Sequence, residues 1–576
     1  MPAHAQDFEQ GFRSPPKEAR PGTWWHWVNG NVSKEGITLD LEAMKRIGLS
    51  GAQIFNVNQG PVGPVKMFSD EWRALTQHAI READRLGLEL GFENGPGWSE
   101  SNGPWVTQEE SMQFVYPTEV TVTGGQKIKV TLPQDNKRAW HDIAVWAFPA
   151  LAGDTGCLAD LKPKLSASAG SKDLENAVDG KLDTVALIAH GDQPKFLQVE
   201  LPEAATFGTA RLIVVPDVKF TADVQVSDDG TTFRKVGSLA RNALGFHTVA
   251  GTFAPVKARI WRVVLNDFIL KDPQDIAVRE LTFGGARLEH PDNKAALHPD
   301  VNSHVPTAWD VPAEMTIDPK TMVDLSDKLV ADGTLEWDAP TGTWTIIRFG
   351  HASNGVGPNT APDGVRGIEC DKLSSQAVAD HFNKGLMNMV LDMAGPPEGK
   401  TVTNMVADSW EAGCLNWTPL MRAEFQKRRG YDPLPWLPTL TGRVIGSVDQ
   451  SERFLWDFRR VVADLIAENH YGVLQELGHK HGLQFYAEAP GIFMPTIADE
   501  LQCKARTDIP MGEFWIDLYG TSDIKEAASA AHINGLRWVA AESFTARPAQ
   551  AGWKSDPYSL KALGDLAFCT GVNRFM

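Results

Sequence analysis

Thr401–Glu411 reads TVTNMVADSWE, a short apolar run that ends in acidic side chains. Four other stretches share this pattern: LELGFEN (Leu88–Asn94), LQFYAEAP (Leu483–Pro490), MGEFW (Met511–Trp515) and WVAAESF (Trp538–Phe544). Each is typical of a buried strand that stops at a polar residue. The C-terminal ends of parallel barrel strands meet at one mouth, where active sites lie. Carboxylates gathered there raise one another's pKa, so the pattern indicates a carboxylate-driven enzyme, with or without a metal.

Strand-like and helix-like segments alternate on both sides of these stretches. Trp24–Val28, Gly51–Val57 and Leu88–Glu93 are predicted strands, and the two helices between them are predicted to begin at the caps Ser33 and Ser69. The alternation resumes near residue 374, with further predicted strands at Thr401–Ala407, Gln484–Ala487, Met511–Trp515, Trp538–Glu542 and Gly571–Met576. Eight strands alternating with helices predict an α/β fold, a TIM-like (β/α)8 barrel.

The region between the two halves follows a different period. From about Val115 to about Val356, alternating runs such as Ala222–Ser227 (ADVQVS) are separated by turn signals, which predicts an antiparallel β-sandwich. Short motifs at Glu175–Gly180, Leu197–Leu201 and Val224–Gly230 resemble the galactose-binding or discoidin-like sandwich. Such a sandwich either binds sugar or only braces a neighbouring domain.

Three parts are therefore expected along the chain. Residues 1–114 carry strands one to three, residues 115–356 form the inserted sandwich, and residues 357–576 carry strands four to eight. Because the chain stops on the eighth predicted strand without a final helix, we expect it to be a C-terminally truncated piece of a longer protein.

Charge and composition exclude several classes of protein. The 576 residues carry a net charge of -18, whereas a nucleic-acid-binding protein is normally basic. There is no apolar run of about 18 residues, so no membrane span is expected. The five cysteines are scattered and never spaced as CxxC, which argues against a zinc knuckle or a dense disulfide framework.

The N-terminus carries one weak targeting signal. Ala3-His4-Ala5 followed by Gln6 resembles the end of a cleaved export signal, which predicts a periplasmic or extracellular protein. The alternative is an ordinary cytosolic N-terminus.

Two glutamates on opposite strands are the candidate catalytic pair. Asp408-Ser409-Trp410-Glu411 closes strand four and Glu542 closes strand seven, and these strands face each other across a barrel mouth. Glycoside hydrolysis needs one protonated acid for the leaving oxygen and one base or nucleophile. Burial beside Trp410 would keep Glu411 protonated by raising its pKa. The alternative is that Asp408 or Glu411 caps the next segment or pairs with an arginine.

Further acidic and aromatic residues complete the predicted site. Glu488 and Glu513 end strands five and six, and with Asp408 they offer oxygen ligands for a hard cation such as calcium. The alternative is that they orient loops through hydrogen bonds. The chain has 19 tryptophans, and several lie near the proposed mouth, where indoles stack on sugar rings. The alternative for most of them is core packing. The candidate substrate-binding residues are Asn94, Trp98, Trp410, Glu488 and Trp515.

Several long motifs occur in an order that closely resembles glycoside hydrolase family 106, the bacterial α-L-rhamnosidases. They are Trp24–Asn31 (WWHWVNGN) with Gly36–Thr38 (GIT), Glu93–Ser99 (ENGPGWS) with Gly103–Trp105 (GPW), Glu369–Ser374 (ECDKLS), Asp408–Gly413 (DSWEAG) with Asn416–Thr418 (NWT), and Arg428–Pro433 (RRGYDP). The resemblance runs from about Arg20 to Met576.

The resemblance implies an inverting hydrolase that acts on terminal α-L-rhamnose with a calcium ion near the sugar hydroxyls. It implies Glu411 as general acid and Glu542 as general base, with the reverse assignment open. Glu513 matches the calcium-ligating glutamate of the family, and Asp408 is a second candidate. Family members usually continue for several hundred residues after the eighth strand, whereas this sequence stops at that strand.

Other functions stay open at this point. The chain is either this rhamnosidase, another carboxylate glycosidase on the same barrel, or a non-catalytic carbohydrate-binding protein. A metal-dependent lyase or aldolase is a weaker alternative, because no lysine lies at a strand end. The expected partner is a carbohydrate or glycoside with a terminal rhamnose.

Overall fold

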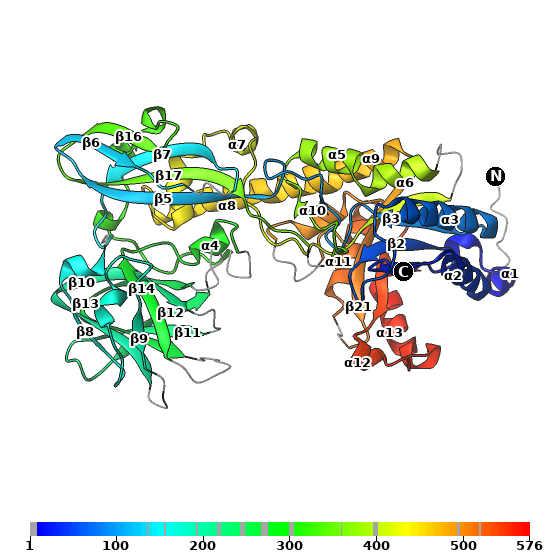
Figure 1. Cartoon of the computed structure of the whole chain (residues 1–576), viewed down its shortest axis with the longest axis horizontal. Coiled ribbons are helices and arrows are strands. Elements are labelled where there is room, and N and C mark those ends of the chain that lie inside the picture. Colours follow the sequence, from blue (N-terminus) through cyan, green and yellow to red (C-terminus); the bar gives the residue numbers. More distant parts are fainter. Residues whose placement is uncertain are drawn as a thin grey trace. The chain divides into compact units, whose positions relative to one another are not determined.

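The structure is a computed structural model, and it divides the chain into two compact units (Figure 1). It describes residues 8–576 except 135–137, 155–156, 190, 192–193, 216–219, 242–247, 267–274, 299–303, 359, 395–400, 492–495 and 518–519. The first unit comprises Met1–Gln113, Ser353–Leu420 and Val462–Met576, and the second comprises Phe114–Ala352 and Met421–Val461. Residues 421–461 thus lie in the second unit, although the sequence pattern groups them with 357–576. The Ala3–Ala5 export signal falls outside the described residues.

The first unit is built on a curled sheet of eight parallel strands with α-helices between them (Figure 1). In sheet order the strands are β1 (Thr23–Val28), β2 (Gly51–Val57), β3 (Glu89–Glu93), β19 (Val402–Ala407), β20 (Gln484–Ala487), β21 (Ile509–Trp515), β22 (Ala540–Thr545) and β23 (Arg574–Phe575). The amide of Gly22, just before β1, donates to the carbonyl oxygen of Phe575 in β23 at 2.9 Å. The α/β class and the eight predicted strands are confirmed, whereas full closure into a (β/α)8 barrel stays a prediction.

The helices of this unit begin and end where the local sequence favours it. Ser33 accepts a hydrogen bond from the amide of Gly36, and Ser69 accepts one from the amide of Trp72, so both predicted caps are confirmed. The helices are α1 (Phe8–Arg13), α2 (Lys34–Ile47), α3 (Asp70–Leu86), α5 (Ser375–Lys384), α6 (Leu386–Ala394), α9 (Val473–Lys480), α10 (Glu500–Lys504), α11 (Ser522–Ile533), α12 (Pro548–Ala551) and α13 (Pro557–Thr570). A short two-stranded pairing joins β4 (Asn102–Gly103) to β18 (Ile368–Glu369).

The predicted long helix over Ser451–Gly478 is helical but not uniform. It consists of α8 (Val448–Leu465), a π-helical segment, η10 (Ile466–Gly472), and then α9. A π-helix inserts an extra residue per turn and is frequent at functional sites. Here the π-helical segment carries His470, which lies next to the acidic site described below.

In the second unit, the stretch Phe114–Ala352 is mainly antiparallel β structure, as the period-two pattern predicts, and the unit also contains α4 (Pro291–Lys294), α7 (Met421–Arg429) and most of α8. A seven-stranded sheet contains β8 (Lys164–Ala167), β9 (Ala186–Ile188), β10 (Lys195–Val215), β11 (Thr221–Ser227), β12 (Arg234–Arg241), β13 (Thr248–Asn266) and β14 (Ile276–Gly284). A four-stranded sheet contains β5 (Gln113–Thr123), β7 (His141–Pro149), β15 (Val323–Asp324) and β17 (Thr343–Ser353), and β6 (Gln126–Thr131) pairs with β16 (Thr334–Ala339). The buried rings of Phe207, Trp261 and Phe283 pack together with centroids 5.1 to 5.2 Å apart. The likeness to a galactose-binding sandwich stays a prediction.

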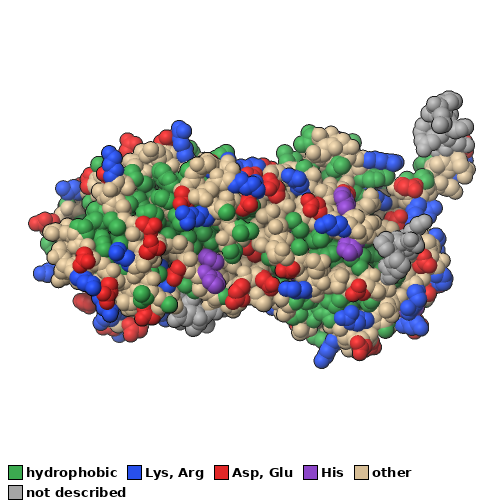
Figure 2. All heavy atoms as spheres, turned by 90° about the horizontal axis from the view of Figure 1, so that it is seen from above, with side chains coloured by type: hydrophobic (Ala, Val, Ile, Leu, Met, Phe, Trp, Pro, Cys, Tyr) green, Lys and Arg blue, Asp and Glu red, His purple; other side chains and the backbone are tan. Residues whose placement is uncertain are grey.

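The spread of surface charges and the state of the cysteines are as the sequence predicts. Figure 2 shows acidic and basic side chains interspersed over the face in view, rather than a broad patch of one sign. All five cysteines are free. Within the described part of the chain, no helix combines the length and the apolar character needed to cross a bilayer.

Candidate active site

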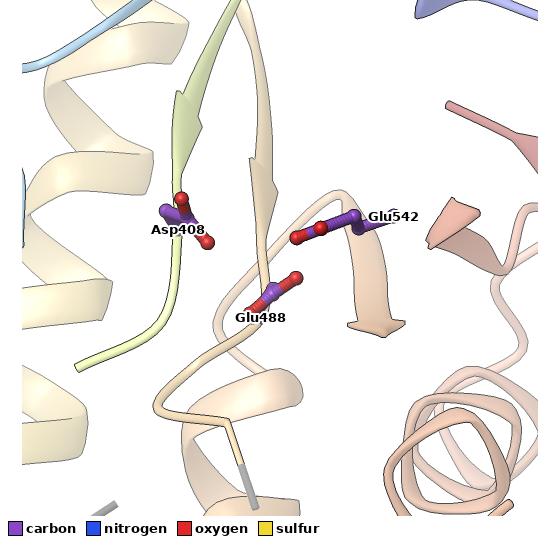
Figure 3. Close-up of side chains that lie close together, drawn as sticks. All are labelled: Asp408, Glu488 and Glu542. Carbon is purple, nitrogen blue, oxygen red and sulfur yellow. The ribbon is translucent and has the colours of Figure 1, made fainter. Parts of the chain in front are cut away.

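Four acidic residues lie at the carboxyl ends of four neighbouring strands. Asp408 directly follows β19, Glu488 directly follows β20, Glu513 lies near the end of β21, and Glu542 lies within β22. One carboxylate oxygen from each of Asp408, Glu488 and Glu542 lies within 4.8 Å of the other two (Figure 3). The parallel sheet thus brings together acids that are up to 134 residues apart in sequence (542 minus 408).

Burial and mutual repulsion raise the pKa of each acid in this group. Burial, reinforced by Glu542, raises the pKa of Asp408 well above its usual value, and burial with Asp408 does the same for Glu488. Burial raises the pKa of Glu542 to about 7, although the Thr545 hydroxyl donates a hydrogen bond to this carboxylate and opposes the shift. Three carboxylates this close do not all ionise at neutral pH unless a positive charge joins them.

Glu488 is the member whose environment fits a cation best. Its side chain is fully buried, and both carboxylate oxygens lack a hydrogen-bond partner among the described residues. Buried carboxylates are normally paired or bound to a metal. The oxygen-only set of Asp408, Glu488 and Glu542 matches the preference of calcium for carboxylate ligands. The residues present therefore fit a calcium ion at this position.

Glu411 and Glu513 lie beside this group rather than in it. Glu411 is exposed rather than buried beside Trp410 as predicted, and residual desolvation, followed by the charge of Glu513, raises its pKa above the usual value. Burial raises the pKa of Glu513, whose Oε2 accepts a hydrogen bond from the indole N–H of Trp515 at 3.0 Å. Of the three acids that the sequence offers as cation ligands, Asp408 and Glu488 are inside the three-carboxylate group and Glu513 is outside it; Glu488 is also a predicted substrate-binding residue.

Trp410 does not present an open face to a sugar, in contrast to the stacking role predicted for it. Its side chain is 2% exposed. The Lys372 ammonium lies 4.7 Å from the ring centroid, and the His470 ring lies edge-on at 5.9 Å. The indole N–H donates to the carbonyl of Gly413 at 2.6 Å, which fixes the turn that carries Glu411. Trp410 therefore stabilises the turn that carries Glu411.

The other predicted substrate-binding residues differ in accessibility. Asn94 is 1% exposed, and its amide donates to the carbonyl of Glu100 at 3.3 Å. Trp98 is half-buried and meets the His26 ring edge-on at 5.4 Å. Trp515 is half-buried and bonded to Glu513. Of these three, the two tryptophans keep exposed surface for a sugar.

A buried ionic network behind Trp410 escaped the sequence analysis. The Lys372 ammonium lies 3.1 Å from Glu369 and 4.0 Å from Glu100, whose Oε1 is 3.0 Å from His470 Nε2. The hydroxyl of Ser99 donates to the Glu369 carboxylate at 2.5 Å. The signal in the sequence is the three charged residues within Glu369–Lys372, inside a motif already matched to the family.

A parallel α/β sheet that gathers proton-carrying carboxyl groups at the ends of adjacent strands is the arrangement of an enzyme that works by acid–base chemistry. The chain belongs to glycoside hydrolase family 106, alpha-L-rhamnosidase, whose sequence model matches residues 13–576. The family resemblance in the sequence motifs is therefore confirmed.

Two relatives are similar over nearly the whole chain. A solved rhamnosidase from Novosphingobium sp. PP1Y is 34% identical, superposes with a TM-score of 0.86, and is matched over 99% of this chain and 56% of its own. A curated protein of Formosa agariphila (strain DSM 15362 / KCTC 12365 / LMG 23005 / KMM 3901 / M-2Alg 35-1), named putative beta-glucuronidase, is 34% identical over 575 residues. That match covers 99% of this chain and 37% of the relative, so the chain spans little more than a third of the curated relative's length.

Proposed function

We propose that this chain hydrolyses terminal α-L-rhamnosides with inversion at the anomeric carbon. The observation that carries the proposal is the set of buried carboxyl groups at the ends of β19, β20 and β22, with Glu411 beside them, in a chain of this family. The solved structure that it resembles over 99% of its length is a rhamnosidase, which favours rhamnose as the sugar.

Glu411 and Glu542 divide the acid and base work in this proposal. Glu411, whose pKa is raised, holds a proton and gives it to the oxygen of the leaving group. Glu542 takes a proton from the attacking water, and a calcium ion beside it would keep its carboxylate ionised for that role. An inverting enzyme needs room for that water between its two carboxyl groups.

Asp408 and Glu488 are the proposed calcium ligands. Their oxygens lie next to Glu542, and both oxygens of Glu488 lack another partner among the described residues. A bound calcium ion would supply positive charge that keeps Glu542 ionised and would offer open coordination positions to sugar hydroxyls. Glu513 remains a candidate ligand on the strength of the family resemblance.

Three wider expectations belong to the same proposal. The sheet closes into a (β/α)8 barrel between β1 and β23, which the hydrogen bond from Gly22 to Phe575 supports. The β-rich unit is a galactose-binding-like sandwich, and the protein is exported and meets its glycoside substrate outside the cytoplasm.

The first test is hydrolysis of 4-nitrophenyl α-L-rhamnopyranoside with calcium and with EDTA. Glu411→Gln and Glu542→Gln are each expected to lower turnover by roughly 10²–10⁴-fold, as loss of a general acid or base does. Glu336→Gln, an exposed acid of β16 paired with Lys127, is the matched control and should keep full turnover. Nuclear magnetic resonance of the first-formed sugar should show the β-anomer.

A β-glucuronidase is the second candidate, because the curated relative carries that name. The nitrophenyl β-glucuronide therefore belongs in the same assay. Cleavage of the glucuronide without cleavage of the rhamnoside would replace the rhamnosidase proposal.

A further inference from the structure

A lysine with no exposed surface lies directly beneath the acidic site. Lys504 is the last residue of α10 and is 0% exposed. Its ammonium donates to the carbonyl oxygen of Glu488, to the carbonyl oxygen of Met511 at 2.8 Å, and to Oδ1 of Asp523 at 2.9 Å. An ammonium group has three N–H donors, so all three are used within this cluster.

Asp523 completes the arrangement from the first turn of α11. It is 2% exposed, and its second oxygen, Oδ2, accepts a hydrogen bond from the backbone amide of Glu513 at 2.7 Å. Gly512 lets α11 approach β21 this closely, because a Cβ there would lie 2.7 Å from the backbone carbonyl carbon of Asp523. The carboxylate thus joins the strand that carries Glu513 to the lysine.

The two residues therefore hold the backbone of two site acids at once. Lys504 holds the carbonyl of Glu488 at the end of β20, and Asp523 holds the amide of Glu513 in β21. Both acids belong to a set of carboxyl groups that repel one another. A backbone free to move would let such groups separate, so their placement depends on a rigid anchor.

We propose that Lys504 and Asp523 form a positioning pair that fixes Glu488 and Glu513 in the geometry needed for catalysis. This inference rests on the proposed function. The pair acts through the backbone. The lysine donates its three hydrogen bonds to two backbone carbonyls and to Asp523, and it donates none to the carboxylates of the site. Within the described part of the chain, the ion pair of Lys504 is with Asp523 rather than with a carboxylate of the site.

A double variant separates positioning from simple stabilisation. Lys504→Met alone leaves Asp523 charged and buried without its partner, so it should lower the melting temperature sharply. Lys504→Met/Asp523→Asn removes the unpaired charge and should recover most of that loss. Positioning predicts that kcat/KM of the double variant nevertheless stays about 10²-fold below the wild-type value, as a displacement of about 1 Å in a catalytic group produces.

Lys294→Met/Glu452→Gln is the matched control. Lys294 is also 0% exposed and lies 2.6 Å from its carboxylate partner, but both residues belong to the second unit. The control should match the wild type in kcat/KM. Recovery of both melting temperature and kcat/KM in Lys504→Met/Asp523→Asn would overturn the proposal.

Hydrogen–deuterium exchange of the variants gives a readout that does not depend on turnover. The segment Ile509–Trp515 should lose protection in the double variant, which removes the bond from Lys504 to the Met511 carbonyl, and keep it in the control. Asp523→Asn alone leaves one side-chain oxygen, which stays with the Lys504 ammonium, so the Glu513 amide alone should lose protection. A wild-type chain inactive on every glycoside would refute the proposed function, whereas unchanged exchange in all variants would refute the positioning pair.

Discussion

Two buried glutamates, Glu369 and Glu488, show how the surroundings of a residue decide its role. Glu369 is buried and receives hydrogen bonds from Ser99 and Ser101 and an ion pair from Lys372. Glu488 is equally buried, yet neither of its oxygens has a hydrogen-bond partner within the described chain. The carboxylate of Glu369 finds all its partners within the protein. The carboxylate of Glu488 is instead placed to bind a cation from solution.

Glu488→Gln should therefore change the response to calcium. In the wild type, calcium at 100 times its Kd should raise the unfolding free energy by about 2.7 kcal/mol. The neutral amide relieves repulsion from Asp408 and Glu542, so the variant should melt at a higher temperature than the wild type in EDTA and gain little from calcium. Thermal melts at several calcium concentrations measure both effects. Equal calcium responses in the variant and the wild type would exclude Glu488 as a ligand.

Trp410→Phe distinguishes sugar stacking from support of the site. The substitution keeps an aromatic ring over Lys372 but removes the hydrogen bond from the indole N–H to the Gly413 carbonyl. Loss of one such bond, worth roughly 1–1.5 kcal/mol, should lower kcat about tenfold through the turn that carries Glu411 and leave KM nearly unchanged. Steady-state kinetics give both constants. A large rise in KM at constant kcat would instead restore the stacking role.

At the scale of the elements, α5 carries a histidine whose hydrogen bonds fix its neutral form. His381 Nδ1 accepts from the Trp105 indole N–H at 3.0 Å, so its Nε2 carries the hydrogen that points to the Glu100 carbonyl at 3.1 Å. Burial lowers the pKa of His381 from 6.5 to about 4. Protonation is therefore easier in the unfolded chain than in the folded one.

The sign of the pH effect follows from that lowered pKa. His381 contributes stability that is fully present above pH 6.5 and is lost as the pH falls toward 4, by at most about 3 kcal/mol. His381→Asn should flatten the fall in unfolding free energy between pH 6.5 and 4, although it lowers stability at every pH. Denaturant unfolding at several pH values measures the slope. His532→Gln, at an exposed position of α11, is the control, and an unaltered slope in His381→Asn would contradict the assignment.

The elements that the sequence predicts well are those with local signals. The Ser33 and Ser69 caps and the buried strand Gly51–Val57 follow from local residue patterns and are observed. The strand predicted at Trp538–Glu542 lies at Ala540–Thr545, because edges of apolar runs mark strand bounds poorly. The π-helical segment Ile466–Gly472 has no signal in a pattern that cannot distinguish it from an α-helix.

The candidate site follows the same division between local and long-range information. Acids at strand ends are visible in the sequence, so Asp408, Glu488, Glu513 and Glu542 were all found. Which of them share a position depends on side-chain direction, which the sequence does not fix. Lys504 was missed because two of its three partners are backbone carbonyls, which have no residue identity to detect.

At the scale of the whole molecule, each unit is assembled from separate stretches of chain. In the first unit β3 pairs with β19, although the stretch Phe114–Ala352 of the second unit lies between them in sequence. In the second unit Lys294 pairs with Glu452, from the stretch Met421–Val461. Each unit therefore folds only after distant segments meet, and its stability is expected to depend on its own buried pairs.

Substituting one buried lysine in each unit should therefore shift the unfolding transition of that unit alone in differential scanning calorimetry. Lys504→Met leaves Asp523 buried and unpaired, which costs roughly 3–5 kcal/mol and should lower the transition of the first unit by on the order of 10 °C. Lys294→Met should lower only the other transition, and by less, because Glu452 is 20% exposed and water partly solvates it. Two transitions, each moved by one variant, would establish two cooperative units. A single transition moved by both variants would mean that the chain unfolds as one.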